Sequence, residues 1–303
     1  MQFDIYSFGM ISSSTLHILA DNFPGADCYS EIKDTYKMVG GEAANSSIVL
    51  SKLGLKVKLD GNWLGKNDEG IFTKQILDRF NIDTSRLTIK ADYSGVQEIV
   101  FADSKTRTIF GTYVQLHDKE DWNTPSSEDI QNSKIVCLDP FFKEESLKTA
   151  QLCKSMNKPY VTIDCEYTSE IAKNAEVLII SGEFRGGKYA GCDHRELYLK
   201  YREHCNGLVI FTFGQDPILY SRKGEAVNKF EPYRVTAVDT AGAGDSFRSG
   251  ILYGLLNGWS DSKTINFASA LAAMVCTTFP GVLNAPGFQD VLQFIESNGR
   301  ILE

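Results

Sequence analysis

KIVCLDP (134–140) opens a series of four short apolar runs that decides the fold class of this chain. The other three are PYVTIDC (159–165), AEVLIIS (175–181) and GLVIFTFG (207–214). Segments with helical spacing lie between them, near 144–156 and 193–205. Runs that are apolar at nearly every position are typical of parallel strands covered on both faces. The alternation therefore predicts an α/β domain with a mainly parallel sheet.

The same alternation extends toward both ends of the chain. Strands are expected at 5–9 and 55–63, and helices at 41–54 and 68–80. The C-terminal third is expected to be mostly helical, over 243–257, 261–278 and 287–302.

Two polar, β-like stretches, 12–38 and 93–113, do not fit a parallel α/β core. The second alternates across a polar turn at 102–106, as a hairpin does. We expect a small sheet that acts as a lid, because lids over active sites exclude water. The alternative is a pair of surface hairpins without a function. The predicted division is a lid of 12–38 and 92–114, and an α/β core of 1–11, 39–91 and 115–303.

The composition narrows the class of protein. The chain has 303 residues, of which 43% are hydrophobic and 23% charged, as in soluble globular proteins. Its net charge of -8 argues against a nucleic-acid partner, since an acidic surface repels a phosphate backbone. Seven cysteines without C-x-x-C spacing indicate reduced thiols in a cytoplasmic protein. The four histidines form no H-E-x-x-H pattern, so a catalytic zinc centre is not expected.

No membrane association is expected either. The N-terminus, MQFDIYSFG, lacks the basic start and apolar core of a signal peptide. The longest apolar stretch, FASALAAMVC (267–276), is about half the length of roughly 20 residues that a membrane span needs. It is expected to be a buried helix.

DTAGAGDSFRSG (239–250) is a candidate anion-binding turn with an acidic residue beside it. Glycines ahead of a helix let backbone N–H groups approach an anion. The stretch is not a P-loop, because Asp245 stands where the lysine would be, and Phe247 rules out a dinucleotide fingerprint. Asp245 could simply cap the helix. Alternatively, the turn holds a moving phosphoryl group while Asp245 accepts the proton of the attacking hydroxyl.

Two motifs resemble one family. DTAGAGD (239–245) matches the D-T-x-G-A-G-D signature of the ribokinase-like (PfkB) carbohydrate kinases, and GGEAAN (40–45) matches their G-G-x-x-x-N signature. Both occur in the family's order, and the resemblance covers essentially the whole chain. It implies a ribokinase-like three-layer αβα sandwich with a β-sheet lid. It also implies phosphorylation of a hydroxyl group of a sugar, such as a ketose or another fructose- or ribose-like sugar, with ATP and Mg²⁺.

The resemblance assigns roles to individual residues. The catalytic base would be Asp245, and the anion hole would be the backbone N–H groups of Gly242, Ala243 and Gly244. The sugar site would be lined by Gly40, Gly41 and Asn45. The nucleotide would lie near Thr212, Gly214 and Gly281. Asp239 would lie near a monovalent cation such as K⁺, or would cap the turn.

The chain departs from the family at two places. Ser14 stands where the family has an aspartate that binds sugar hydroxyls, and Gln97, Arg107 or Tyr113 of the hairpin could compensate. The family's N-x-x-E motif, which organises Mg²⁺-bound water, is replaced by SGEFR (181–185). Glu183 could supply the acid from a shifted register.

Two alternatives to a sugar kinase stay open: a nucleoside kinase of the same fold, and an inactive sensor of sugars or nucleotides. The resemblance also implies that the lid could pair across a homodimer, since exposed β edges tend to seek a partner.

Overall fold

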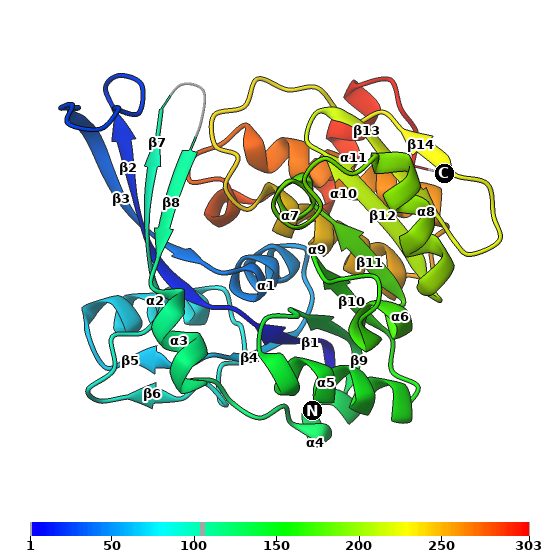
Figure 1. The fold of residues 1–303 in the computed structure, drawn as a ribbon, viewed down its shortest axis with the longest axis horizontal. Coiled ribbons are helices and arrows are strands. Elements are labelled where there is room, and N and C mark those ends of the chain that lie inside the picture. Colours follow the sequence, from blue (N-terminus) through cyan, green and yellow to red (C-terminus); the bar gives the residue numbers. More distant parts are fainter. Residues whose placement is uncertain (1, 104–106, 303) are drawn as a thin grey trace.

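An eight-stranded sheet forms the centre of the computed structural model, which describes residues 2–103 and 107–302 (Figure 1). Its strands, in order across the sheet, are β4 (Val57–Gly61), β1 (Phe3–Gly9), β9 (Ser133–Leu138), β10 (Tyr160–Ile163), β11 (Val177–Ile180), β12 (Leu208–Phe213), β13 (Asp216–Ser221) and β14 (Asn228–Phe230). The strands from β4 to β12 are parallel, and β13 and β14 continue the sheet antiparallel. The predicted α/β fold with a mainly parallel sheet is confirmed.

Helices cover both faces of this sheet. One face carries α1 (Glu42–Lys52), α2 (Asp68–Arg79), α9 (Ala243–Leu256), α10 (Asp261–Cys276) and α11 (Phe288–Ser297). The other carries α3 (Tyr113–Lys119), α4 (Ser127–Gln131), α5 (Lys143–Ser155), α6 (Glu170–Asn174) and α8 (His194–His204). Successive strand residues alternate between the two cores: Ile135 and Cys137 pack in one, and Val136 and Leu138 in the other. Such two-sided burial is the reason that these strands are apolar at nearly every position.

Two short elements lie near the carboxyl ends of the parallel strands. They are α7 (Gly182–Lys188), which follows β11, and the 3₁₀ turn η1 (Val282–Asn284), which follows α10. Within the described ranges 2–103 and 107–302, no helix is long and apolar enough to cross a bilayer. The apolar stretch 267–276 lies instead inside α10, where most of its side chains are buried against α9 and the sheet.

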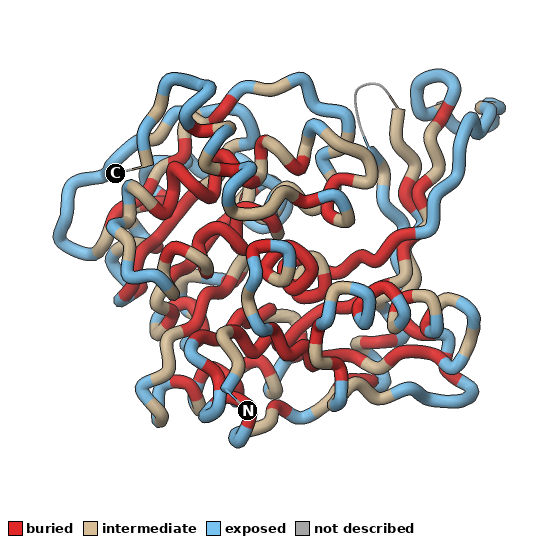
Figure 2. The backbone as a smooth tube through the Cα atoms, turned by 180° about the vertical axis from the view of Figure 1, so that it is seen from behind, coloured by how far each residue is buried: buried red, intermediate tan, exposed pale blue. Residues whose placement is uncertain are grey.

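A second sheet stands away from the core (Figure 1). Its four strands, in order, are β3 (Ile32–Gly40), β2 (Ser12–Leu19), β7 (Gln97–Ala102) and β8 (Arg107–Gly111). Each of the two polar stretches forms an antiparallel pair, and β2 joins the pairs by lying parallel to β7. Figure 2 shows that much of this sheet is exposed, in contrast to the buried core. We call it the lid; the predicted lid turn 102–106 includes 104–106, which lie outside the described residues.

A minor two-stranded sheet, β5 (Leu64–Gly65) and β6 (Ile89–Lys90), lies below the lid in Figure 1. The division of the chain into core and lid at the predicted boundaries stays a prediction, although the four lid strands fall within or beside the two predicted segments.

Candidate active site

The glycine-rich turn begins helix α9. Gly242 is the N-cap and has a left-handed backbone with φ of 73°, and a Cβ there would overlap the side chain of Val282. Both conditions require glycine. Asp239 holds the turn in place: one carboxylate oxygen accepts from the Ala241 N–H at 2.9 Å, and the other from the Gly281 N–H at 3.1 Å. The turn is therefore tied to the loop that precedes η1.

Asp245 lies in the first turn of α9, opposite the second glycine-rich motif. The Asn45 amide of α1 donates to Asp245 Oδ2 at 2.8 Å, and the Ser46 hydroxyl donates to the Asp245 carbonyl at 3.3 Å. Burial raises the pKa of Asp245 to about 6, against the lowering effect of the Arg248 charge and the Asn45 hydrogen bond. A carboxylate with a pKa near neutrality is suited to act as a general base.

A cavity of about 450 Å³ opens between the lid and the core, and Asp245 lies in its wall. The predicted site residues that line it are Ser14, Gly40, Gly41, Asn45, Arg107, Tyr113, Glu183, Gly242 and Asp245. It also has apolar walls, formed among others by Leu16, Met38, Val100, Ile109 and Val282. We call this space the acceptor cavity, after the role predicted from the sequence for Gly40, Gly41 and Asn45. Its volume falls in the range of small-molecule sites, roughly 300–1,000 Å³.

Glu98 of the lid fills the place next to Ser14. The two residues are paired in register on the parallel strands β2 and β7, and the Ser14 hydroxyl donates to Glu98 Oε2. The Tyr113 hydroxyl, at the start of α3, donates to Glu98 Oε1. Gln97 is not part of the cavity wall, because successive residues of a strand point to opposite faces. The residue of β7 that faces the cavity is therefore Glu98, and not the adjacent Gln97 that the sequence suggested.

The acceptor cavity contains a second unexpected acid, Glu42, which follows Gly41 at the start of α1. Burial, together with the negative charges of Asp139 and Asp245, raises the pKa of Glu42 well above its ordinary range. These surroundings therefore favour the protonated form of Glu42 over the ionised one.

A buried ion pair connects the segments of the chain that form the site. Arg248 and Asp139 are both fully buried, and the guanidinium donates to Asp139 Oδ1. The other Arg248 nitrogens donate to the Ser46 hydroxyl, at 3.0 and 2.9 Å, and to the Glu42 carbonyl at 2.6 Å. Asp139 also accepts from the Met10 N–H at 2.8 Å. Arg248 thus links α9 directly to α1 and, through Asp139, to the ends of β9 and β1.

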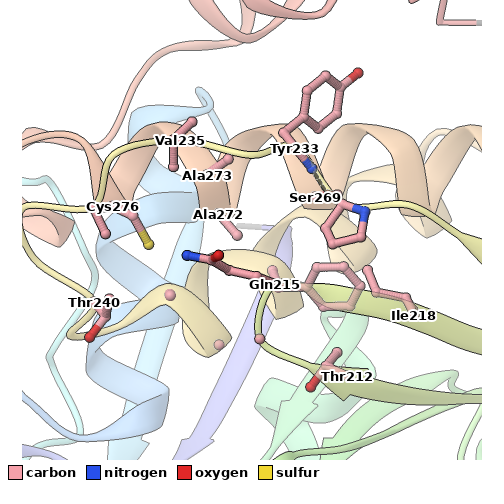
Figure 3. A pocket seen from close by; sticks show the side chains of 16 residues that line it. Thr212, Gln215, Ile218, Tyr233, Val235, Thr240, Ser269, Ala272, Ala273 and Cys276 are labelled. Atoms are coloured by element: carbon pink, nitrogen blue, oxygen red, sulfur yellow. Dashed lines mark hydrogen bonds between the residues drawn. The ribbon is translucent and has the colours of Figure 1, made fainter. Parts of the chain in front are cut away.

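A second cavity, of about 240 Å³, lies on the other side of the glycine-rich turn (Figure 3). Its wall includes Thr212, Gly214 and Gln215 of the β12–β13 hairpin, Ala243 and Gly244 of the turn, and Ser269, Ala272, Ala273 and Cys276 of α10. In Figure 3, Gln215 extends from the hairpin toward α10. We call this space the nucleotide cavity, after the role predicted from the sequence for Thr212 and Gly214. Gly281 does not line it; its N–H is bound to Asp239 and its Cα packs against the end of α10.

The turn separates the two cavities: Gly242 and Asp245 face the acceptor cavity, whereas Ala243 and Gly244 face the nucleotide cavity. Of the three predicted anion-hole donors, the Ala243 N–H also makes a turn bond to the Thr240 carbonyl at 3.3 Å. The first N–H groups of an α-helix have no partner one turn back, so this end of α9 presents donors and a partial positive charge.

The region that replaces N-x-x-E has a local structural explanation. Ser181 is the N-cap of α7, accepting from the Phe184 N–H at 3.0 Å and donating to Asp164 Oδ2 at 2.8 Å. Glu183, one residue earlier than Phe184, lines the acceptor cavity. Across 2–103 and 107–302, no three His, Cys, Asp or Glu side chains are grouped as a metal site.

Comparison with known proteins gives the class of this chain. The family model described as pfkB family carbohydrate kinase matches residues 4–284. A 5-dehydro-2-deoxygluconokinase from Clostridium beijerinckii is 26% identical over 297 residues, which cover 88% of this chain and 86% of that protein. A nucleoside kinase from Methanothermobacter thermautotrophicus is 29% identical over 271 residues, or 84% of each chain.

The fold is shared with solved structures. The structure of Arabidopsis thaliana ribokinase complexed with ribose and ATP has a TM-score of 0.79 with this chain, at 16% sequence identity, and the match covers 98% of this chain and 99% of that one. The chain belongs to the pfkB family of carbohydrate kinases, which are phosphotransferases that act on hydroxyl groups. The predicted family, ribokinase-like fold and enzyme class are confirmed.

Proposed function

We propose that this protein transfers the γ-phosphoryl group of ATP to a hydroxyl group of a sugar, with Asp245 as the general base. The observation that carries the proposal is the position of the α9 turn between two cavities, with Asp245 facing one and Gly244 the other. A phosphoryl donor in the nucleotide cavity and an alcohol in the acceptor cavity would meet at this turn. The ribokinase of the same fold was solved with ribose and ATP, which are the two kinds of ligand that the proposal assigns to this chain.

Asp245 would accept the proton of the acceptor hydroxyl as that oxygen attacks the γ-phosphorus. Asn45 holds Oδ2 by a 2.8 Å hydrogen bond, which leaves Oδ1 to face the alcohol. The bond between the γ-phosphorus and the bridging oxygen of ATP breaks, and ADP leaves. Negative charge on the moving phosphoryl group would be met by the free N–H groups at the start of α9, chiefly those of Gly242 and Gly244.

The nucleotide is assigned to the cavity between the β12–β13 hairpin and α10. Thr212 and Gly214 lie at the hairpin end of it, and small side chains such as Ala272 and Ala273 leave room for a flat ring beside α10. Gly281 contributes to this site only through the loop that it anchors to Asp239.

Mg²⁺ bound with ATP would supply positive charge to the phosphates. Kinase Mg²⁺ sites take one or two carboxylates and complete their coordination with phosphate oxygens and water. Glu183, in the wall of the acceptor cavity, fits this modest requirement and is our proposed protein partner. Glu183→Gln should raise the Mg²⁺ concentration needed for half-maximal rate; an unchanged Mg²⁺ dependence would contradict the assignment.

Asp239 is better explained as a structural residue than as a K⁺ ligand. Both of its carboxylate oxygens already accept backbone N–H groups that close the turn. We therefore propose that K⁺ is not required at Asp239. Equal rates in potassium and tetramethylammonium salts would support this, and a rate that depends on K⁺ would overturn it.

A nucleoside is the second candidate acceptor, favoured by the nucleoside kinase that is 29% identical over 84% of this chain. The inactive-sensor alternative fits less well, because Asp245, Asn45 and the glycine turn are all in place. A screen that couples ADP release to the oxidation of NADH, over ketoses, aldoses and nucleosides, tests all three. Turnover of no acceptor, combined with acceptor-dependent thermal stabilisation, would instead support the sensor.

We also propose that the outer face of the lid pairs with a second copy of this chain. Thr15, His17, Ile99, Phe101 and Phe110 lie on the strand positions that alternate with the cavity-facing ones. Ile99 is 46% exposed and Phe110 53%. Light scattering should show a dimer that Phe110→Glu weakens. A monomeric wild type at micromolar concentration would contradict the pairing.

A further inference from the structure

Glu98 is the one carboxylate that the lid sheet presents to the acceptor cavity, within the described part of the lid. It stands on β7 directly beside Ser14 of β2, the position where the sequence lacks the expected aspartate. The side chain crosses from one strand to the other and accepts the Ser14 hydroxyl. The cavity therefore has a carboxylate beside residue 14, although it is carried by β7 and not by β2.

Two hydroxyl groups fix the orientation of this carboxylate. Ser14 donates to Oε2 and Tyr113 donates to Oε1, so each oxygen has one protein donor. An ionised carboxylate offers about four lone-pair sites, and two of them stay available for hydroxyl groups in the cavity. Gly40 is a condition for this geometry, because a Cβ at residue 40 would overlap both the Glu98 carboxylate and the Ser14 hydroxyl.

The charges around the cavity point to the kind of molecule that enters. Among the residues that the structure describes, the acids in its wall are Glu42, Glu98, Glu183 and Asp245, and the one cation is Arg107. Glu42 can be set aside because its pKa is raised, and Glu183 because it is the proposed partner of Mg²⁺; the two remaining acids, Glu98 and Asp245, still outnumber the cation. The positive charge of Arg107 also interacts with Asp245, whose pKa it lowers, so it is partly neutralised before a ligand binds. A sugar acid or a sugar phosphate would meet repulsion here, whereas neutral hydroxyl groups would find acceptors.

We propose that Glu98, positioned by Ser14 and Tyr113, binds hydroxyl groups of the acceptor and makes the enzyme selective for an uncharged polyhydroxylated acceptor, a neutral sugar or a nucleoside. The inference rests on the proposed kinase function. It differs from what the name of one matched relative indicates, since that protein is named for a sugar acid, 5-dehydro-2-deoxygluconate, and it agrees with the name of another, a nucleoside kinase.

The test measures steady-state kinetics with D-ribose, D-fructose and adenosine as neutral acceptors, and with D-gluconate and fructose 6-phosphate as anionic ones. For the best neutral acceptor, Glu98→Gln should raise KM about 10-fold and Glu98→Ala about 100-fold, since hydrogen bonds to a charged group are lost. The kcat should change by less than about threefold, because the group does not touch the reacting atoms. Gln97→Ala is the matched control, as it alters the adjacent residue on the opposite face of the same strand, and its KM should stay within about twofold.

A rescue distinguishes binding from a merely structural role. Ser14→Asp introduced together with Glu98→Ala returns a carboxylate to the cavity from strand β2, and should recover at least about tenfold of the loss in kcat/KM relative to Glu98→Ala alone. If Glu98→Ala acted only by destabilising the fold, a carboxylate at residue 14 would not restore kcat/KM. The thermal unfolding temperature of each variant measures such destabilisation separately.

The outcomes separate the inference from the function on which it rests. A wild type that phosphorylates a neutral acceptor, with an unchanged KM in Glu98→Ala, overturns the role of Glu98 and leaves the kinase function standing. A wild type that prefers D-gluconate or fructose 6-phosphate overturns the selectivity. Turnover of none of the five compounds overturns the proposed function and this inference with it.

Discussion

Asn45 Nδ2 donates a 2.8 Å hydrogen bond to Asp245 Oδ2, and this bond joins the two glycine-rich motifs of the chain across 200 residues of sequence. One partner lies on α1 and the other on α9, two helices that pack on the same face of the sheet. The bond stabilises the ionised form of the carboxylate and fixes which oxygen faces the acceptor cavity. It therefore links the position of the proposed base to its protonation state.

The pH dependence of kcat/KM should follow from this environment. Because burial raises the pKa of Asp245 to about 6, the base is protonated, and the rate falls, as the pH drops below about 6. Asn45→Ala removes a hydrogen bond that lowers this pKa, so its rate profile should move to higher pH. Profiles of both proteins between pH 5 and 9 check the shift; a shift to lower pH would be incompatible with this origin.

Asp245→Asn should stabilise the fold. The pKa of this group is higher in the folded protein than its ordinary value of 3.8, so ionisation is unfavourable in the native state. The wild type accordingly loses stability between about pH 4 and 6, and the neutral asparagine avoids this loss. Above pH 6 the free energy of unfolding of the variant should exceed that of the wild type by up to about 3 kcal/mol.

Urea titrations at pH 4 and pH 8 measure this difference. It should be largest at pH 8 and close to zero at pH 4, where both proteins are neutral at residue 245. A variant that is less stable than the wild type at pH 8 would show that the carboxylate is favourable rather than costly in the fold.

Breaking the buried ion pair should have the opposite effect on stability. Arg248→Met leaves the fully buried Asp139 without its cation, and should cost about 3–5 kcal/mol. Arg222→Met is the matched control, since Arg222 pairs with Glu176 and Asp261 at a partly exposed site and should cost about 1 kcal/mol or less. Equal losses in the two variants, measured by chemical denaturation, would argue against the supporting role of Arg248.

The two cavities should respond separately to mutation. Ala272 lines the nucleotide cavity and is labelled in Figure 3. Ala272→Phe should fill part of this space and raise the KM for ATP about tenfold or more, because the phenyl ring would occupy the space proposed for the flat ring of the nucleotide. The affinity for the acceptor, measured calorimetrically without ATP, should not change. A variant that loses both affinities equally would show that the cavities are not independent sites.

Much of the fold was predictable because the sequence pattern follows directly from two-sided burial. The runs at 134–140, 159–165, 175–181 and 207–214 all became parallel strands, since only a doubly covered sheet buries them at every position. Short helices such as α4 and α6 were not predicted. Helices of five residues have too little periodicity to detect, and these two depend on Ser126 and Ser169 as caps.

The site was predicted in part. Asn45 and Asp245 come together as the paired motifs imply, because both glycine turns lie at the ends of helices that share a face. Glu98 was missed in favour of Gln97, since the choice depends on the strand register between β2 and β7, which pattern alone does not specify. Arg248 and Asp139 were missed because their pairing joins segments 109 residues apart and leaves no local signal.

The central claim is that Asp245 activates an acceptor hydroxyl while the nucleotide occupies the other side of its turn. The most direct test is the acceptor-dependent rate of ADP formation by the wild type and by Asp245→Asn, with ATP affinity measured in parallel. We predict a loss of about 10²- to 10⁴-fold in kcat with ATP affinity unchanged. Turnover by Asp245→Asn within a few fold of the wild type would contradict the claim.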